Sequence, residues 1–144
     1  MSGQRSFRLE VLTPERPFYR GDCVSLTVQL EDGMLGIMAG HSPLTAALPD
    51  GEISFIKPDG EKVICAVASG MIDVDRNDVR LLCGSALLPE EIDAEEERRA
   101  IAEAELKMKQ KQSRREYMLT KIAIAKSLNK LRVKNHGNKF NNNI

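Results

Sequence analysis

Residues 85–107, SALLPEEIDAEEERRAIAEAELK, decide how this chain is organised. Before Pro89 the sequence is punctuated by glycines and alternates apolar with polar residues. From Pro89 until Gly137 glycine is absent, and Ala, Glu, Lys, Arg, Leu and Met dominate. These six residue types are the strong helix formers. The change at Pro89 therefore predicts a β domain over residues 1–88 followed by a helical segment.

Three stretches before Pro89 place apolar residues at every second position, which predicts half-buried strands. They are Phe7, Leu9 and Val11; Val24, Leu26, Val28 and Leu30; and Val63, Cys65 and Val67. Turn residues recur at short intervals, at 20–22, 31–33, 49–51, 58–60 and 76–78. Short strands separated by frequent turns predict an antiparallel β-sandwich or barrel.

The segment after Pro89 predicts a two-helix hairpin over residues 89–136. Asp93 with Glu96 and Ser113 with Glu116 have the spacing of helix N-terminal capping pairs. The apolar face of the first helix is thin and consists of Ile101, Ala104 and Met108. That of the second helix is broader and consists of Tyr117, Ile124, Leu128 and Leu131. Gly137 is expected to end the second helix, and the Asn-rich tail 137–144 is expected to be disordered.

Composition restricts the class of protein. The chain has 144 residues, 42% hydrophobic and 29% charged, as a globular protein does. It has no apolar run near the roughly 18 residues that cross a bilayer and no apolar signal segment at its start, so a protein that stays in the cytoplasm is expected. Cys23, Cys65 and Cys83 lie in apolar stretches without Cys-x-x-Cys spacing and are expected to be reduced core residues.

A formal net charge of zero hides a strong asymmetry. Residues 1–88 hold 8 Lys/Arg against 12 Asp/Glu, a net −4, and residues 90–105 hold 2 against 8, a net −6. Residues 107–139 hold 11 against 1, a net +10. The basic second helix admits three interpretations: a solvated face, a patch for nucleic acid or anionic lipid, or a surface for an acidic protein.

The sequence offers little for catalysis or metal binding. The histidines are His41, in a loop, and His136, near the end, and there is no glycine-rich phosphate loop. Asp73 and Asp75 share one face of a predicted strand, where paired carboxylates could act as acid and base, but solvated surface acids are the commoner outcome. An enzyme that uses these two aspartates and His41 would lack an activated nucleophile and a metal set. No catalytic residue and no metal are predicted.

Residues 30–44, LEDGMLGIMAGHSPL, resemble the signature of F-type ATP synthase epsilon subunits, in which an acidic turn and a Gly-Ile stretch lead into Gly-His-x-Pro-Leu. The resemblance extends over Phe7 to Val133. It implies a non-catalytic rotor subunit without a cofactor, peripheral on the cytoplasmic face of the cell membrane. The implied partners are the gamma subunit, the c-ring, and the alpha and beta subunits, and not nucleic acid.

The resemblance also implies roles for particular residues. The sandwich would bind the gamma subunit, and the c-ring/gamma contact would be formed by Glu31, Asp32, Gly33, Met34, Gly40, His41 and Ser42. The family's hairpin lies folded on the sandwich or extends into the catalytic head, where it blocks rotation in the direction of hydrolysis. Its basic helix would then meet an acidic loop of the beta subunits, through Lys121, Lys126, Lys130 and Arg132.

Some members of that family bind ATP on the folded hairpin through an Ile/Leu-Asp-x-x-Arg-Ala motif. The candidates here are Ile92, Asp93, Arg99, Lys126 and Lys130. Glu96 and Glu97 stand at the Arg and Ala positions of the motif, and a carboxylate repels a triphosphate. ATP is therefore expected to bind weakly or not at all.

An alternative from another class is a cytosolic binding module, in which a β-sandwich with a coiled-coil arm recruits an acidic protein. Co-purification with the alpha, beta and gamma subunits would distinguish the two hypotheses.

Overall fold

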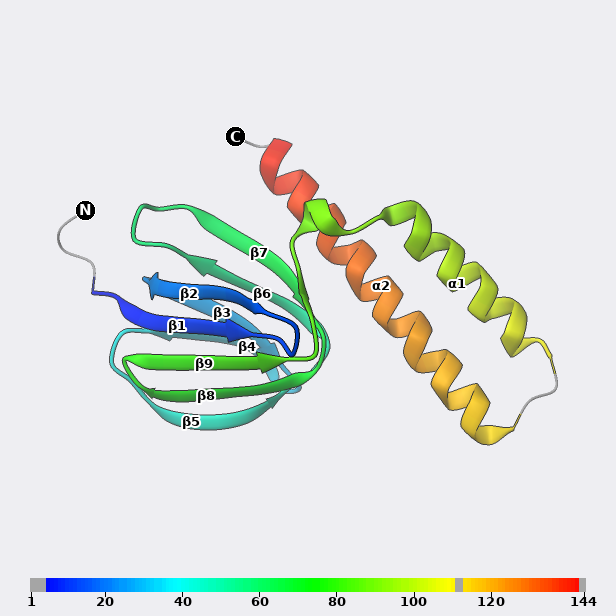
Figure 1. The fold of residues 1–144 in the computed structure, drawn as a ribbon, viewed down its shortest axis with the longest axis horizontal. Coiled ribbons are helices and arrows are strands. Elements are labelled where there is room, and N and C mark those ends of the chain that lie inside the picture. Colours follow the sequence, from blue (N-terminus) through cyan, green and yellow to red (C-terminus); the bar gives the residue numbers. More distant parts are fainter. Residues whose placement is uncertain (1–4, 111–112, 143–144) are drawn as a thin grey trace. The chain divides into compact units, whose positions relative to one another are not determined.

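The computed structural model describes residues 5–110 and 113–142 and divides the chain into two compact units, Met1–Leu87 and Leu88–Ile144. The first unit contains all ten strands, and the second contains the helices (Figure 1). Each unit is described by itself.

The first unit is a β-sandwich of two five-stranded sheets. The strands are β1 (Phe7–Leu12), β2 (Pro17–Cys23), β3 (Ser25–Leu30), β4 (Gly33–Met38), β5 (His41–Leu48), β6 (Gly51–Ile56), β7 (Lys62–Val67), β8 (Gly70–Arg76), β9 (Asp78–Cys83) and β10 (Ala86–Leu87). One sheet has the order β2-β1-β9-β8-β5 and the other β10-β7-β6-β3-β4. Neighbouring strands are antiparallel except β1 and β9, which are parallel. The prediction of an antiparallel sandwich followed by helices is confirmed.

The core of the sandwich includes most of the residues that the alternation had marked, together with others that it had not. Leu9, Val11, Leu26 and Val28 are fully buried, because each lies on the inward face of a strand whose next residue points outward. Phe55 and Leu81, both nearly inaccessible, join them in one cluster. Burying a side chain of this size contributes about 1.5–3 kcal/mol, so the cluster is the main source of stability in this unit.

The turn predicted at residues 20–22 is wrong, because β2 continues through it. Gly21 pairs with Leu9 of β1, and the connection between the strands lies at residues 13–16 instead. A Cβ atom at Gly21 would lie 2.9 Å from the hydroxyl oxygen of Tyr19, whose O–H donates to the carbonyl oxygen of Asp22 at 2.6 Å. The glycine therefore makes room for a ring and does not reverse the chain.

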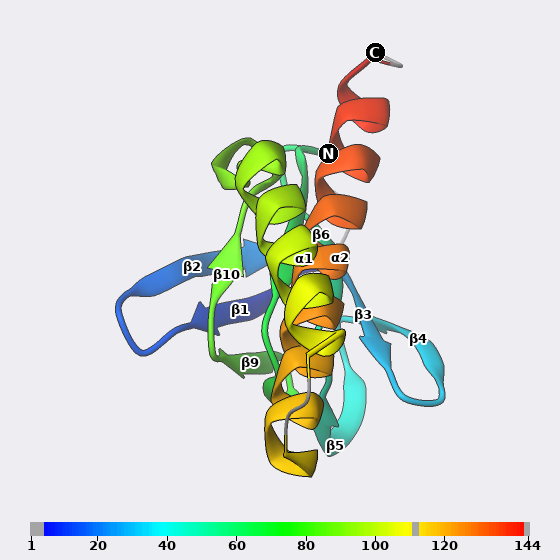
Figure 2. The same ribbon diagram turned by 90° about the vertical axis from the view of Figure 1, so that its right-hand side faces the viewer.

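The second unit begins with a short 3-10 helix, η1 (Pro89–Glu91), followed by α1 (Ala94–Met108) and α2 (Arg114–Asn142). Asp93 caps α1, since its Oδ1 accepts from the backbone N–H groups of Glu95 and Glu96 at 3.0 and 3.2 Å. Ser113 Oγ accepts from the N–H of Glu116 at 3.2 Å at the start of α2. Asp93 and Ser113 are thus confirmed as the N-terminal caps of the two helices. The two helices lie side by side (Figure 2).

Only part of each predicted apolar face is covered. Ile101, Ala104 and Met108 of α1 are half-buried, as are Ile124 and Leu131 of α2. Tyr117 and Leu128 remain 39% and 53% exposed.

The predicted end of the second helix at Gly137 is wrong. Helix α2 continues to Asn142, and the last two residues of the expected disordered tail, Asn143 and Ile144, lie outside the described residues. Gly137 is buried, and a Cβ atom there would lie 2.4 Å from Cγ of Pro89. Lys134 Nζ also donates to the carbonyl oxygen of Pro89 at 3.1 Å. The glycine thus admits the proline ring against the helix, so that η1 packs on the last third of α2.

The three cysteines are free thiols in the sandwich core. Cys23 and Cys65 are fully buried, and Cys83 is 4% exposed. Burial raises the pKa of both Cys23 and Cys83 from 9.0 to about 11, because desolvation disfavours the thiolate.

We expect the native protein to react with a thiol reagent such as 5,5′-dithiobis(2-nitrobenzoate) about two orders of magnitude more slowly than the denatured chain at pH 8. The thiolate is the reactive form, and burial both suppresses it and blocks access. The absorbance of released thionitrobenzoate measures the rate, and the protein in denaturant gives the three-thiol end point. Rapid reaction of two or more native thiols would contradict the burial.

Candidate interaction surfaces

The turn between β3 and β4 presents two carboxylates to solvent. Leu30 pairs with Gly33, so Glu31 and Asp32 form the tip. Gly33 has a φ of +131°, which glycine adopts without strain. Met34 follows with 63% of its surface exposed. This tip stands out from the sheet in Figure 2 and combines negative charge with a flexible apolar side chain.

The loop from Gly40 to Ser42 carries the chain from one sheet to the other. Gly40 has a φ of +81°, and its N–H donates to Oδ1 of Asn77 at 2.9 Å. His41 is half-buried, and its Nδ1 lies 2.7 Å from the carbonyl oxygen of Ser42. The residue Ser42 itself is exposed. His41 pairs with Arg76 and Leu44 with Val74, with a break in register between them. The break leaves Ser42 and Pro43 exposed at a bulge in the sheet edge.

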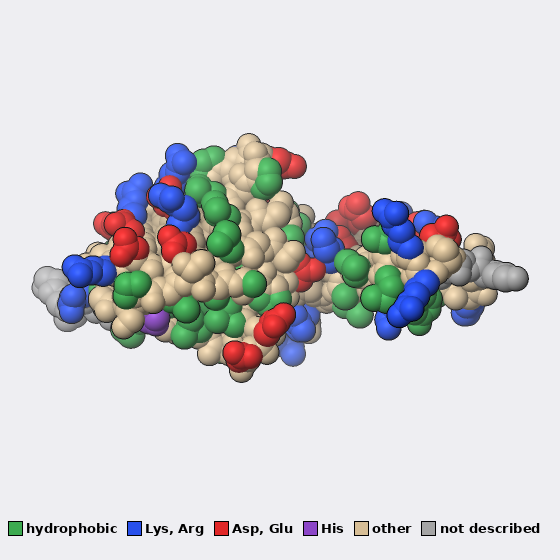
Figure 3. All heavy atoms as spheres, turned by 90° about the horizontal axis from the view of Figure 1, so that it is seen from below, with side chains coloured by type: hydrophobic (Ala, Val, Ile, Leu, Met, Phe, Trp, Pro, Cys, Tyr) green, Lys and Arg blue, Asp and Glu red, His purple; other side chains and the backbone are tan. Residues whose placement is uncertain are grey.

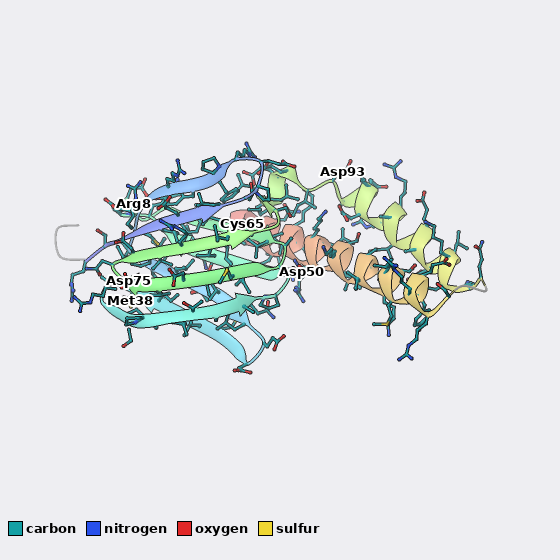
Figure 4. All side chains as sticks on the ribbon, turned by 60° about the horizontal axis from the view of Figure 1, so that its bottom comes forward. Arg8, Met38, Asp50, Cys65, Asp75 and Asp93 are labelled. Carbon is teal, nitrogen blue, oxygen red and sulfur yellow. The ribbon has the colours of Figure 1, made fainter. Side chains whose placement is uncertain are left out.

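The structure does not bring these two predicted contact segments together. They lie at the two ends of β4, whose six residues span about 20 Å at the usual rise of a strand. Met38, the last residue of β4, lies at the same end of the sandwich as Arg8 and Asp75, opposite Asp50 (Figure 4). The seven predicted contact residues, which lie at 31–34 and 40–42, therefore make two patches on the sandwich.

The four predicted inhibitory cations of α2 differ in their surroundings. Lys121 and Lys126 are exposed, and Lys121 Nζ lies 5.5 Å from the ring centre of Tyr117. Lys130 Nζ is 3.4 Å from Oε1 of Glu97 on α1, and Glu97 is the more buried of the pair, with 13% of its side chain exposed. Arg132 Nη2 donates to Oδ1 of Asn129 at 2.6 Å. Lys121, Lys126 and Arg132 are thus exposed, whereas Lys130 is half-buried and paired across the hairpin.

Apolar side chains accompany the basic ones on the hairpin, and the sequence reasoning did not single them out. Leu106 of α1 is 60% exposed, and Met118, Leu119 and Ile122 of α2 are 50%, 56% and 49% exposed. Figure 3 shows green and blue side chains interleaved over this unit. The spacing of residues 118, 119 and 122 is a helical one that could have been read from the sequence. Such a mixture suits a partner that offers both acidic and apolar groups.

The five candidate ATP ligands do not form a cation pocket. Ile92 is 3% exposed, and the Asp93 carboxylate is used as the cap of α1. Arg99 is exposed, and Lys130 is paired with Glu97. A triphosphate at Lys130 would have to displace a carboxylate that already neutralises it.

The aspartates considered as an acid-base pair lie on the exposed face of β8. Asp73 Oδ1 accepts from Oγ1 of Thr45 at 2.9 Å and lies opposite Arg80, while Asp75 lies opposite Asp78. Glu10 on the same sheet is paired with Arg20 at 3.2 Å and with Arg80 at 3.6 Å. Asp73 thus ends a solvated row of alternating charges across the sheet, Arg20, Glu10, Arg80 and Asp73, whereas Asp75 lies beside the like charge of Asp78.

Within residues 5–110 and 113–142, no three His, Cys, Asp or Glu side chains are grouped so that they could hold a metal ion. In the same range, no helix combines the length and apolar character needed to span a membrane.

Residues 6–89 match the family model described as the β-sandwich domain of the ATP synthase delta/epsilon chain. The chain is 36% identical to the ATP synthase epsilon chain of Caldanaerobacter subterraneus over 90% of its length and 94% of that protein. It is also 36% identical to the epsilon chain of Caldicellulosiruptor saccharolyticus, over 88% of its length and 92% of that protein.

Among solved structures, a chain of the Euglena gracilis mitochondrial ATP synthase, from a structure of OSCP, F1 and the c-ring, aligns with a TM-score of 0.74. The sequence identity is 22%, and the match covers 83% of this chain and 75% of the other. At this identity the likeness concerns the fold.

Proposed function

This chain belongs to the ATP synthase delta/epsilon family, as a relative of the bacterial epsilon chains, and from that premise we propose that it is a non-catalytic subunit of the central stalk. It couples ion-driven rotation to ATP synthesis and restrains ATP hydrolysis. The observation that carries the proposal is a match along nearly the whole chain, hairpin included, at 36% identity. In this role it is a peripheral protein on the cytoplasmic face of the cell membrane.

The sandwich is the part that docks on the rotor, with the gamma subunit and the c-ring as partners. Two exposed patches support this role: the acidic tip at Glu31 and Asp32 with Met34, and the loop from Gly40 to Ser42. Because they lie at opposite ends of β4, they meet different parts of the rotor. A sandwich held at two separated points resists rotation relative to its partner better than one held at a single point.

The hairpin is the part that restrains hydrolysis, by contacting the alpha and beta subunits. Its exposed lysines, Lys121 and Lys126, and its exposed apolar residues, Met118 and Ile122, support a contact with an acidic protein surface. Lys130 is paired with Glu97 across the hairpin, so it becomes fully available only when that ion pair opens, whereas Arg132 is exposed and its hydrogen bond is to Asn129 on the same helix.

Affinity purification of the tagged full chain from its own cells tests the assignment to the complex. Recovery of the alpha, beta, gamma and c subunits in fixed ratio is expected. Recovery of a different acidic protein without these subunits would instead support the cytosolic binding module. Washing at about 0.5 M salt separates a specific stalk contact from retention by the basic helix, since screening weakens surface charge contacts.

We expect ATP to bind the isolated chain weakly or not at all. Asp93 is committed to the cap of α1 and Lys130 to Glu97, and Glu96 stands where ATP-binding relatives place arginine. Isothermal titration calorimetry measures the dissociation constant. The double variant Glu96→Arg, Glu97→Ala, which removes both carboxylates and frees Lys130, is the matched comparison and should bind more tightly. A low micromolar constant for the unmodified chain would contradict the prediction.

A further inference from the structure

We propose that Asn77 is a positioning residue, which fixes the Gly40–Ser42 loop in the conformation that docks on the rotor. This inference rests on the proposed function, since it takes that loop as a contact. Asn77 lies in the turn between β8 and β9, 37 residues away from Gly40 in sequence.

The loop needs an external anchor because it has little support of its own. It joins β4, the edge strand of one sheet, to β5, the edge strand of the other, and His41 is the one of its three residues that pairs with a neighbouring strand. His41 pairs with Arg76, and the register then breaks before Leu44. Gly40 has a φ of +81°, which glycine adopts without strain. Its N–H donates to Oδ1 of Asn77 at 2.9 Å, which ties the first residue of the loop to a neighbouring turn.

Asn77 is itself firmly held, so its side chain is a fixed point. Asp75 pairs with Asp78, which leaves Arg76 and Asn77 as a two-residue turn. Arg76 has a φ of +57°, the sign that such tight turns require at their first position. The carbonyl oxygen of Asn77 accepts from the N–H of Arg8 at 2.8 Å. Residue 77 therefore joins three segments: the start of β1, the β8–β9 turn and the Gly40–Ser42 loop.

The amide at residue 77 has the right chemistry for this work. Its side-chain oxygen accepts the Gly40 N–H while its backbone oxygen accepts the Arg8 N–H, so one residue satisfies two donors. Aspartate at this position would keep both acceptors, whereas alanine would keep only the backbone one. The comparison of the two variants therefore distinguishes the positioning role of the side-chain oxygen from a general effect of substituting a turn residue.

The test uses the full chain with Asn77→Ala and Asn77→Asp, and Asn77→Gly, which also lacks a side-chain acceptor, in place of the alanine variant if that one fails to fold. Asp59→Ala is the control, because Asp59 Oδ1 accepts from the N–H of Glu61 at 2.9 Å in the β6–β7 turn, a bond of the same kind elsewhere in the sandwich. Amide exchange at Gly40 is followed by NMR. Rebinding is measured to synthase complex from the same source that has been depleted of this chain.

Asn77→Ala is expected to speed exchange at Gly40 about tenfold and to weaken rebinding by a similar factor, as loss of one hydrogen bond does. Asn77→Asp and Asp59→Ala are expected to leave both unchanged. Unchanged exchange at Gly40 in Asn77→Ala would overturn the proposal. Faster exchange at Gly40 with normal rebinding would overturn the docking role of Asn77. The variant His41→Ala then distinguishes failure of the positioning proposal from failure of the loop as a contact. If His41→Ala also rebinds normally, the loop is no contact and that part of the proposed function fails.

Discussion

A chain that ends before Pro89 is expected to fold, to assemble with the rotor and to support ATP synthesis, while ATP hydrolysis by the complex rises about tenfold. A factor of ten corresponds to about 1.4 kcal/mol, the lower part of the range usual for coupling between sites. The sandwich should survive because its core cluster contains only residues from Phe7 to Ala86. Every strand is likewise complete at Leu87.

The measurement compares ATP hydrolysis and ion-driven ATP synthesis by membranes that contain the full or the shortened chain. Circular dichroism of the isolated shortened chain should show a cooperative loss of β structure on heating. A matched control ends the chain after Lys139, which removes only the end of α2. If hydrolysis is unchanged in the shortened complex although the sandwich is bound, the hairpin does not restrain this synthase.

Replacing Lys121, Lys126, Lys130 and Arg132 together by alanine is expected to release much of the same inhibition in complexes of full length. These cations lie in the segment of net +10, and attraction to an acidic surface weakens when the charges are removed. Raising the salt concentration should reproduce part of the effect, because the Debye length falls to about 8 Å at 0.15 M. Alanine at Lys107 and Lys109, at the end of α1, is the control for loss of charge elsewhere in the hairpin.

The structure adds a contrast within this set. Lys130 is held by Glu97, so Glu97→Gln should free it and deepen the inhibition, whereas Lys121→Ala with Lys126→Ala should relieve it. The two variants change hydrolysis in opposite directions only if the cations act by contacting a partner. Equal rates for all variants at low salt would mean that the hairpin does not act through charge.

The sequence predicted those strands of the sandwich that bury one face and expose the other. Alternation marked Leu9, Leu26 and Cys65 because one face of each strand is buried and the other is wet. Both helix caps were also predictable, since Asp93 and Ser113 act on N–H groups two or three residues away. Strand alternation and helix capping depend on neighbours within a few residues, so the sequence alone predicts them.

Two glycines were misread for a common reason. Gly21 was taken as a turn and Gly137 as the end of a helix, because glycine favours both. In the structure each lies under a ring, that of Tyr19 and that of Pro89 respectively. A glycine that makes space has the same sequence signal as one that turns the chain, and only the fold distinguishes them.

The sequence predicted the candidate contact residues as one set, but it did not predict that they form two separate patches. Nothing in residues 31–42 says that one segment begins β4 and the other follows its end, because β4 has no alternation of its own. The bonds from Asn77 to Gly40 and from Lys130 to Glu97 join positions 37 and 33 residues apart. Periodicity carries no information about such pairs.

The parallel pairing of β1 with β9 also has a consequence for biosynthesis. β1 is synthesised first and can pair with β2 as soon as β2 follows. Its other edge stays unpaired until β9, Asp78–Cys83, has been synthesised. Ribosomes add about 5–20 residues per second, and contacts distant in sequence slow folding, so the sandwich closes only after its last long strand has emerged. The helices are translated afterwards. A nascent chain from which Leu87 has emerged would therefore already carry all the strands of the sandwich before its helices are available.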